Sequence, residues 1–127
     1  MIEIIGNKKY KKVYISGPMT GIENLNEFEF KKYEEKFKNL NFEVINPHNL
    51  FSKDEVKLMD DLLKEKKITF EEHHSFFMKR DIKEMMNCDF LTVLNGWEKS
   101  KGANIEVYIA RNLKMPIVDS VTLKELF

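Results

Sequence analysis

Two carboxylate side chains stand where a helix would turn them partly toward the protein interior. Asp81 lies one helical turn after Phe77 and one turn before Met85, at the edge of an apolar stripe. Glu106 shares a helical face with Val107 and with the alanines at positions 103 and 110. A desolvated carboxyl has a raised pKa and can exchange protons near neutral pH. A carboxylate at the edge of a stripe can equally be solvated, so the pattern leaves both interpretations open for each residue.

A loop of small residues follows the first predicted strand. Its sequence is SGPMTG, and its candidate ligand-binding residues are Ser16, Gly17, Pro18, Met19 and Thr20. Glycines allow a ligand to approach the backbone, and exposed N–H groups at a helix start suit a phosphate. The loop is neither a GxGxxG motif nor a Walker loop, which disfavours dinucleotides and triphosphates. The alternative is an ordinary turn between a strand and a helix.

Three further residues are candidates for ligand contacts. Ser100 precedes a helical pattern and is expected to cap it, and a serine at a helix start can also hold an anion. Trp97 either covers a bound base or packs against the core. His48 follows Pro47 in a loop expected on the ligand side of the sheet.

The sequence does not favour a metal site or an organic cofactor. His73 and His74 are adjacent and point to different helical faces, and His48 has no spaced companions. Cys88 is the single cysteine, so no internal disulfide is possible, and we expect it to be buried and inert.

Composition limits the classes of partner. The chain has 127 residues, which suits a single domain over residues 1–127. Its 21 basic and 21 acidic residues give a formal net charge of +0, which disfavours nucleic-acid polymers as partners. No apolar run approaches the length of a membrane span, and the N-terminus has no ordinary secretory signal. We therefore expect a cytoplasmic protein.

Strands and helices alternate along the sequence. Short β-branched or apolar runs predict strands at 13–16, 42–45, 89–94 and 115–118. The pairs Asn26 with Glu29, Ser52 with Glu55, and Thr69 with Glu72 predict capped helices, and a fourth helix is expected over 101–112 with Leu113 inward. We expect a frayed lead-in over 1–12 and a last helical turn over 122–127. This alternation predicts a parallel sheet with ligands at the carboxyl ends of its strands.

Three spaced motifs together resemble a known family. They are KVYISGPMTG, then RDIKEMMNCDFLTVL with Asp81 and Asp89, then SKGANIEVYIARNLKMPIV with Gly102 and Glu106. From about residue 12 to 119 the chain resembles the nucleoside 2-deoxyribosyltransferase-like superfamily, which includes the 2'-deoxynucleoside 5'-monophosphate N-hydrolases. The phrase NGWEKSKGA is similar to small, largely phage-borne members of undetermined function. The expected fold is an α/β, flavodoxin/Rossmann-like three-layer sandwich with a four- or five-stranded, mostly parallel sheet in the order 2-1-3-4.

The resemblance implies roles for individual residues. Glu106 matches the glutamate that attacks the anomeric carbon, Asp81 the acid that assists departure of the base, and Tyr14 a tyrosine that orients the nucleophile. Ser100 matches a serine that binds the 5'-phosphate, and Gly102 in the same motif is a further candidate for substrate binding. Asn104 stands where a glycine is common, which implies a narrower pocket. The resemblance also implies a homodimer that needs no cofactor.

These observations support three hypotheses. The first is cleavage or transfer at the N-glycosidic bond of a nucleoside 5'-monophosphate or related nucleotide, or of a nucleoside as in the deoxyribosyltransferases. The second is a nucleotide-binding protein without turnover, and the third is an interaction module with a vestigial pocket. For the first, we expect Tyr14, Asp81 and Glu106 to converge on one cleft near residues 16–19 and Ser100.

Overall fold

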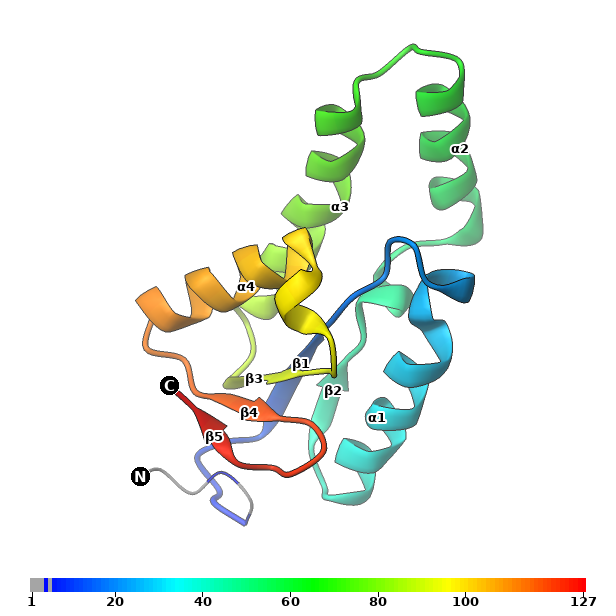
Figure 1. Cartoon of the computed structure of the whole chain (residues 1–127). Helices are drawn as coiled ribbons and strands as arrows, with labels where there is room; N and C mark the ends of the chain where they lie inside the picture. Colours follow the sequence, from blue (N-terminus) through cyan, green and yellow to red (C-terminus); the bar gives the residue numbers. More distant parts are fainter. Residues whose placement is uncertain (1–3, 5) are drawn as a thin grey trace.

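The computed structural model describes residue 4 and residues 6–127, and its centre is a five-stranded sheet (Figure 1). The strand order is β2-β1-β3-β4-β5, and every neighbouring pair is parallel except β4 with β5. The strands are β1 (Lys12–Ser16), β2 (Glu43–Ile45), β3 (Phe90–Val93), β4 (Ile117–Asp119) and β5 (Glu125–Leu126). The predicted α/β class and strand order are confirmed, with β5 added at the edge.

Within residues 6–127, four α-helices and three short 3-10 helices connect the strands. The α-helices are α1 (Glu27–Asn39), α2 (Lys53–Lys64), α3 (Phe70–Met85) and α4 (Lys101–Asn112). The 3-10 helices are η1 (Glu23–Asn26), η2 (Pro47–Leu50) and η3 (Trp97–Lys99). None of the described helices is long and apolar enough to cross a membrane.

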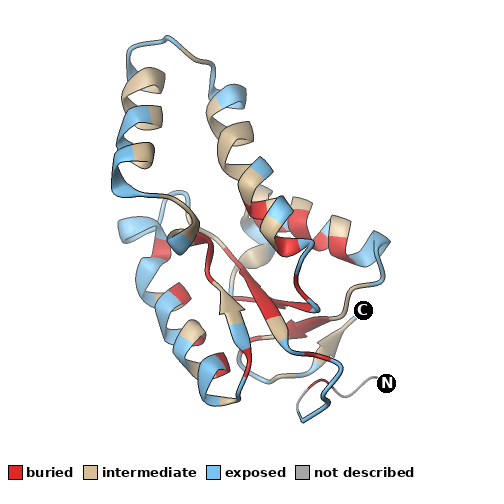
Figure 2. Ribbon diagram, turned by 180° about the vertical axis from the view of Figure 1, so that it is seen from behind, coloured by how far each residue is buried: buried red, intermediate tan, exposed pale blue. Residues whose placement is uncertain are grey.

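The two faces of the sheet bury different helices. Val13 on β1 packs in one cluster with Phe37 of α1, whereas Tyr14, the next residue, packs in another with Val107 of α4. This alternation follows from the period of two in a strand. Helix α1 covers one face, and α4 with the last turns of α3 covers the other (Figures 1 and 2). Strand β3 is buried on both faces, as expected for a central parallel strand.

Helices α2 and α3 form a hairpin that projects beyond the sheet (Figure 1). The predicted capping boxes at the start of both helices are confirmed: Ser52 and Thr69 accept bonds from the N3 backbone, and Glu55 and Glu72 accept bonds in return. No residue of α2 is buried (Figure 2). The position of α2 therefore depends on contacts with α3 within the hairpin and on contacts where the hairpin joins the rest of the domain.

The predicted capping box at Asn26 is wrong, although α1 does begin at the next residue. Asn26 has a left-handed backbone with φ of 63°, and its side chain caps nothing in the helix. Its Nδ2 instead donates to the carbonyl oxygen of Pro18 at 2.9 Å. A tertiary bond between two loops replaces the local cap.

The expected helical turn over 122–127 is also wrong, because the chain reverses there. Oδ1 of Asp119 accepts bonds from the N–H groups of Val121 and Thr122, and Leu123 is left-handed with φ of 62°. The turn brings β5 back along β4, whose edge is otherwise unpaired. Six residues are too few for a stable helix, so pairing with the sheet is favoured.

Two smaller expectations need correction. The lead-in over 1–12 is anchored to the core at two points: Ile4 and Tyr10 are buried, and the Tyr10 ring meets Phe90 edge-on at 6.3 Å, whereas residues 6–9 and 11 are exposed. Residues 1–3 and 5 lie outside the described residues. Leu113 is 54% exposed, because it follows the last residue of α4 and has already left the buried face.

Candidate active site

Glu106 is held by two hydroxyl groups from strand β1. Tyr14 and Ser16 lie two residues apart on β1, so both side chains point to the face that α4 covers. The Tyr14 hydroxyl donates to Oε2 of Glu106 at 2.5 Å, and Ser16 Oγ donates to Oε1 at 2.7 Å. Glu106 is 4% exposed, and both hydroxyl residues are fully buried. The carboxylate is thereby fixed in position from both sides.

Burial and hydrogen bonding act in opposite directions on Glu106. Burial raises the pKa of this carboxyl to about 7, while the bonds from Tyr14 and Ser16 favour its ionised form. The pKa of Tyr14 is raised well above 10 by burial first and then by the charges of Glu106 and Asp81. Tyr14 therefore remains a neutral donor, and Glu106 can be ionised near neutral pH.

Asp81 is the second buried carboxyl and is electrostatically coupled to the first. It is 9% exposed. Burial first, and the Glu106 charge second, raise the pKa of Asp81 to about 8, while Arg80 opposes the shift. Its Oδ1 has no hydrogen-bond partner among the described residues. Since Glu106 has two donors and Asp81 Oδ1 has none, we assign the proton at neutral pH to Asp81.

The loop after β1 is closely packed against the end of β3. A Cβ atom on Gly17 would lie 2.8 Å from Cβ of Leu94, so only glycine fits there. Across the same gap, a Cβ on Gly96 would meet Pro18 at 3.6 Å. The loops after the first and third strands thus face each other, as expected for loops at the carboxyl ends of neighbouring parallel strands. In the same loop, Met19 packs against the core on the α1 side and Thr20 is exposed.

The first turn of α4 comes just before Glu106 in the sequence, and side chains stabilise its position. Ser100 Oγ accepts a bond from the N–H of Ala103 at 3.1 Å, which confirms the predicted cap. A Cβ on Gly102 would lie 3.4 Å from Met78 Sδ, so Gly102 brings α4 close to α3. Asn104 does not enter the site through its amide, since Nδ2 donates to the carbonyl oxygen of Ser100 at 2.7 Å.

Trp97 and His48 have packing partners in the structure. Trp97 lies against the cluster of core residues that contains Tyr14, and its ring meets Phe127 edge-on at 6.2 Å. Nε2 of His48 bonds the carbonyl oxygen of Leu25 at 3.0 Å, and its ring packs on Phe30. Leu25 is one of three consecutive residues with positive φ, so His48 supports a strained segment. Their contact with a ligand stays a prediction.

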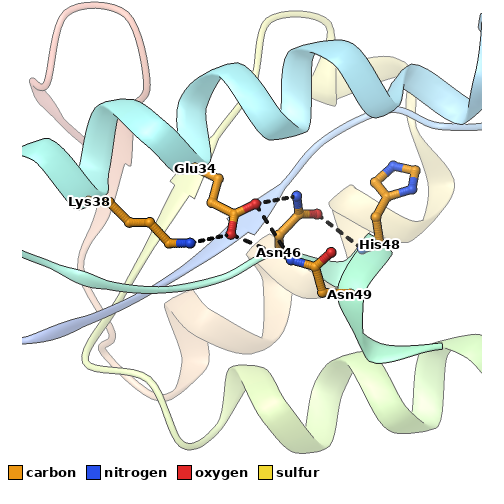
Figure 3. Close-up of polar contacts among 5 residues, drawn as sticks. All are labelled: Glu34, Lys38, Asn46, His48 and Asn49. Atoms are coloured by element: carbon orange, nitrogen blue, oxygen red, sulfur yellow. Dashed lines mark hydrogen bonds and ion pairs between the residues drawn. The ribbon is translucent and has the colours of Figure 1, made fainter. Parts of the chain in front are cut away.

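Figure 3 shows the polar cluster that anchors the η2 loop. Glu34 of α1 accepts bonds from Asn46 at 3.1 Å and from Lys38 at 2.8 Å, while the Asn46 side chain accepts from the backbone of His48. The His48 ring points away from Glu34 (Figure 3). These bonds lower the pKa of Glu34 although partial burial opposes them. The cluster joins α1 to the end of β2 and is separate from Glu106.

The described part of the chain has surface hollows beside α3 and beside β5. One lies along α3 and includes Met59, Phe76 and Lys83, and another lies between the end of α4 and β5. Neither is lined by Tyr14, Asp81 or Glu106. The feature that marks a candidate site is instead the buried Glu106 carboxylate with its two hydrogen-bond donors. No group of three metal-binding side chains occurs among the described residues.

Sequence reasoning assigned Ser16 to the substrate and missed its bond to Glu106. The spacing of two between Tyr14 and Ser16 on a strand is the signal that could have found it, because it puts both hydroxyls on one face. The Glu55–Arg80 ion pair beside Asp81, at 2.8 Å, was also missed. Only the packing of α2 on α3 makes that pair.

Comparisons with known proteins agree with the fold. A family model described as a domain of unknown function, DUF4406, matches residues 11–119. No curated protein matches the chain. Among solved structures, a 2-deoxyribosyltransferase from the psychrotolerant bacterium Bacillus psychrosaccharolyticus is 18% identical, with a TM-score of 0.57 over 85% of this chain and 70% of that one. The chain therefore belongs to the DUF4406 family and has a nucleoside 2-deoxyribosyltransferase-like fold.

Proposed function

We propose that this protein cleaves or transfers the N-glycosidic bond of a nucleoside 5'-monophosphate or related nucleotide, with Glu106 as the nucleophile. The observation that carries the proposal is the pair of hydroxyl donors on a buried glutamate, at 2.5 and 2.7 Å, coupled to a second buried carboxyl with an unpartnered oxygen. Two carboxyls in different environments are what glycosidic cleavage requires. The similarity in fold to a 2-deoxyribosyltransferase supports the same class of reaction.

The first step forms a bond between Glu106 and the sugar. One carboxylate oxygen attacks the anomeric carbon as the bond from that carbon to the base nitrogen breaks. The electron pair of the broken bond stays on the base, and the proton of Asp81 neutralises it. Tyr14 and Ser16 hold the carboxylate in its attacking orientation, so little reorganisation is needed during the reaction.

The second step releases the sugar from Glu106. Asp81 has lost its proton and can now take one from water, or from a second base, as that molecule attacks the anomeric carbon. The ester bond to Glu106 breaks and its electron pair returns to the carboxylate. Water gives hydrolysis and a second base gives transfer, so one arrangement serves both outcomes. This chemistry uses side chains of the protein alone.

The experiment incubates the purified protein with ribo- and deoxyribonucleosides and their 5'-monophosphates, with and without an added free base. Chromatography separates free base and exchanged nucleoside from the starting material. We expect release of base from at least one deoxy substrate, and faster release from a monophosphate than from its nucleoside. A folded protein that releases no base and exchanges none contradicts the proposal. Stabilisation by a nucleotide that remains intact would then identify a binding protein.

Ser100 offers a test of the phosphate preference. It lies at the start of α4, where a backbone N–H group and a hydroxyl face the same end of the helix. We expect Ser100→Gly to raise KM for a monophosphate more than for the matching nucleoside, because glycine still tolerates the N-cap position. An equal change for both substrates would contradict a phosphate at this helix start.

We further propose that the chain acts as a homodimer. Val56, Met59, Leu62 and Leu63 share the apolar side of α2, yet none is buried in the single chain. A second copy would bury more of such a surface. Sedimentation velocity at micromolar concentration should give the mass of two chains. The mass of one chain would contradict the proposal.

A further inference from the structure

Arg80, the residue before Asp81, binds a carboxylate and a backbone carbonyl through its guanidinium group. Arg80 makes a two-point ion pair with Glu55 of α2: one guanidinium nitrogen lies 3.0 Å from Oε1 and the other lies 2.8 Å from Oε2. The first nitrogen also donates to the carbonyl oxygen of Leu50 at 2.9 Å. A bidentate pair of this kind fixes the plane of the guanidinium as well as its position.

Two aromatic rings hold the same guanidinium. Its carbon lies 4.6 Å from the ring centre of Phe51 and 5.3 Å from that of Phe76, so Arg80 is attracted to both ring faces. Among the described residues, no ion pair joins Arg80 to Asp81. The arginine beside the buried acid is therefore directed to α2 and to the ring pair.

The ionisable groups that act on Asp81, directly or through Arg80, come from four elements. Glu106 on α4 raises the pKa of Asp81, and Arg80 on α3 lowers it. Tyr14 on β1 is neutral and interacts with the Asp81 charge. Glu55 on α2 acts through Arg80: it is the counter-charge to the arginine that lowers the pKa of this carboxyl. An arginine without that counter-charge would favour the ionised form of Asp81 more strongly.

We propose that Glu55 is a positioning residue of the site, because its two-point ion pair holds the Arg80 guanidinium against Phe51 and Phe76 and partly offsets the effect of its charge on the Asp81 carboxyl. Asp81 thereby retains the proton that the leaving base requires. The inference rests on the proposed role of Asp81 as an acid. It adds that the projecting α2–α3 hairpin sets the protonation of the site through its base.

The first test titrates Asp81 directly, without turnover. Infrared or ¹³C NMR spectra of the whole protein with labelled aspartate would be compared with those of Asp81→Asn to assign the carboxyl. In Glu55→Gln, we expect the pKa of Asp81 to fall by about 1 unit, the lower end of the effect of a nearby opposite charge. Glutamine can still accept the bond from the Ser52 N–H, so the start of α2 is preserved.

A double variant separates charge from structure. Arg80→Met removes the cation, so the pKa of Asp81 should rise in that variant. In the double variant Glu55→Gln/Arg80→Met, the pKa of Asp81 should recover from its lowered value in Glu55→Gln to at least the wild-type value. A purely structural role for the pair predicts the opposite, since the double variant would lose the same contacts and show no recovery. If Glu55→Gln does not fold, the Arg80→Met variant still tests the proposal. A rise in the pKa of Asp81 in Arg80→Met supports it, and a fall in that pKa overturns it.

The second test measures activity against pH in the intact protein. With the pKa of Asp81 lowered by about 1 unit, the alkaline limb of kcat should move down by the same amount, and kcat at pH 7.5 should fall about threefold with KM unchanged. Asp61→Asn is the matched control, because it removes another ion pair of α2, the exposed Lys57–Asp61 pair at 2.7 Å. In this control, neither the alkaline limb of kcat nor the pKa of Asp81 should change.

The two tests distinguish failure of the inference from failure of the proposed function. An unchanged pKa of Asp81 in folded Glu55→Gln overturns the inference, whatever the activity. A lowered pKa together with the absence of any turnover supports control of Asp81 by Glu55 and contradicts the proposed reaction instead.

Discussion

The Tyr14 hydroxyl and the Glu106 carboxylate are joined by a buried hydrogen bond of 2.5 Å across 92 residues of sequence. The bond links strand β1, an interior strand of the sheet, to the second turn of α4. A phenol donates well only while it is neutral, and burial together with the nearby carboxylates keeps the pKa of Tyr14 well above its usual value. The pair therefore holds an oriented anion on a rigid part of the fold.

Replacement of Glu106, the proposed nucleophile, should remove the proposed turnover and preserve the fold. Glu106→Gln keeps the shape of the side chain but cannot form a bond to the anomeric carbon. We expect kcat to fall at least about 100-fold, as for the loss of a covalent step. Base release is the measurement. Glu98→Gln in η3, an exposed position, is the control and should retain full activity.

Removal of the Tyr14 hydroxyl should weaken catalysis and move its pH dependence. In Tyr14→Phe, the Glu106 anion loses one of two donors, so its pKa should rise and the acid limb of the activity profile should move to higher pH. We expect kcat to fall about 10- to 100-fold, since a hydrogen bond to a charged group is worth about 1.5–3 kcal/mol. Tyr10→Phe, another buried tyrosine with ring packing against Phe90, should leave both quantities unchanged. An acid limb that stays in place would argue against Tyr14 as the donor.

Asp81 should make the protein less stable as pH rises. Its folded-state pKa of about 8 lies above the ordinary value of 3.8, so the folded protein keeps a proton that the unfolded chain releases. Stability is therefore full below about pH 4 for this group and falls as pH rises toward 8. In Asp81→Asn, the drop in Tm between pH 5 and pH 8.5 should be smaller than in the wild type. Asp54→Asn, at an exposed position in α2, should show the wild-type drop. Equal drops in all three proteins would contradict a buried, protonated Asp81.

Gly17 should not tolerate even one added carbon. The Cβ of Gly17→Ala would lie 2.8 Å from Cβ of Leu94, so β1 and β3 would have to separate at their ends. We expect a loss of about 1–3 kcal/mol in the free energy of unfolding, as for other overpacked sites. Gly102→Ala is the contrasting case: its Cβ would meet only the flexible Met78 side chain at 3.4 Å, and alanine favours the helix. Urea unfolding should show a large loss in the first variant and little or none in the second.

The sequence was sufficient for those elements whose cause is local. Three α-helices are capped as the sequence predicts, by Ser52 with Glu55, by Thr69 with Glu72, and by Ser100. Each cap joins residues three positions apart, which lie within hydrogen-bond reach at any helix start. The all-apolar run that forms β3 likewise predicted a central strand. Asn26 shows the limit of this reasoning: its side chain found a partner in Pro18, eight residues away, and the local cap was lost.

Some features of the candidate site follow from the sequence, and others follow only from the tertiary structure. The sequence alone supplied two carboxylates at the edges of apolar helical stripes and a tyrosine on the first strand. Only the tertiary structure decided that Asp81 and Glu106 are both desolvated, that Tyr14 and Ser16 hold Glu106, and that Oδ1 of Asp81 has no partner. The reason is physical: a helical period places a side chain at the border between core and solvent, and the packing of α3, α4 and β1 determines on which side of that border it lies.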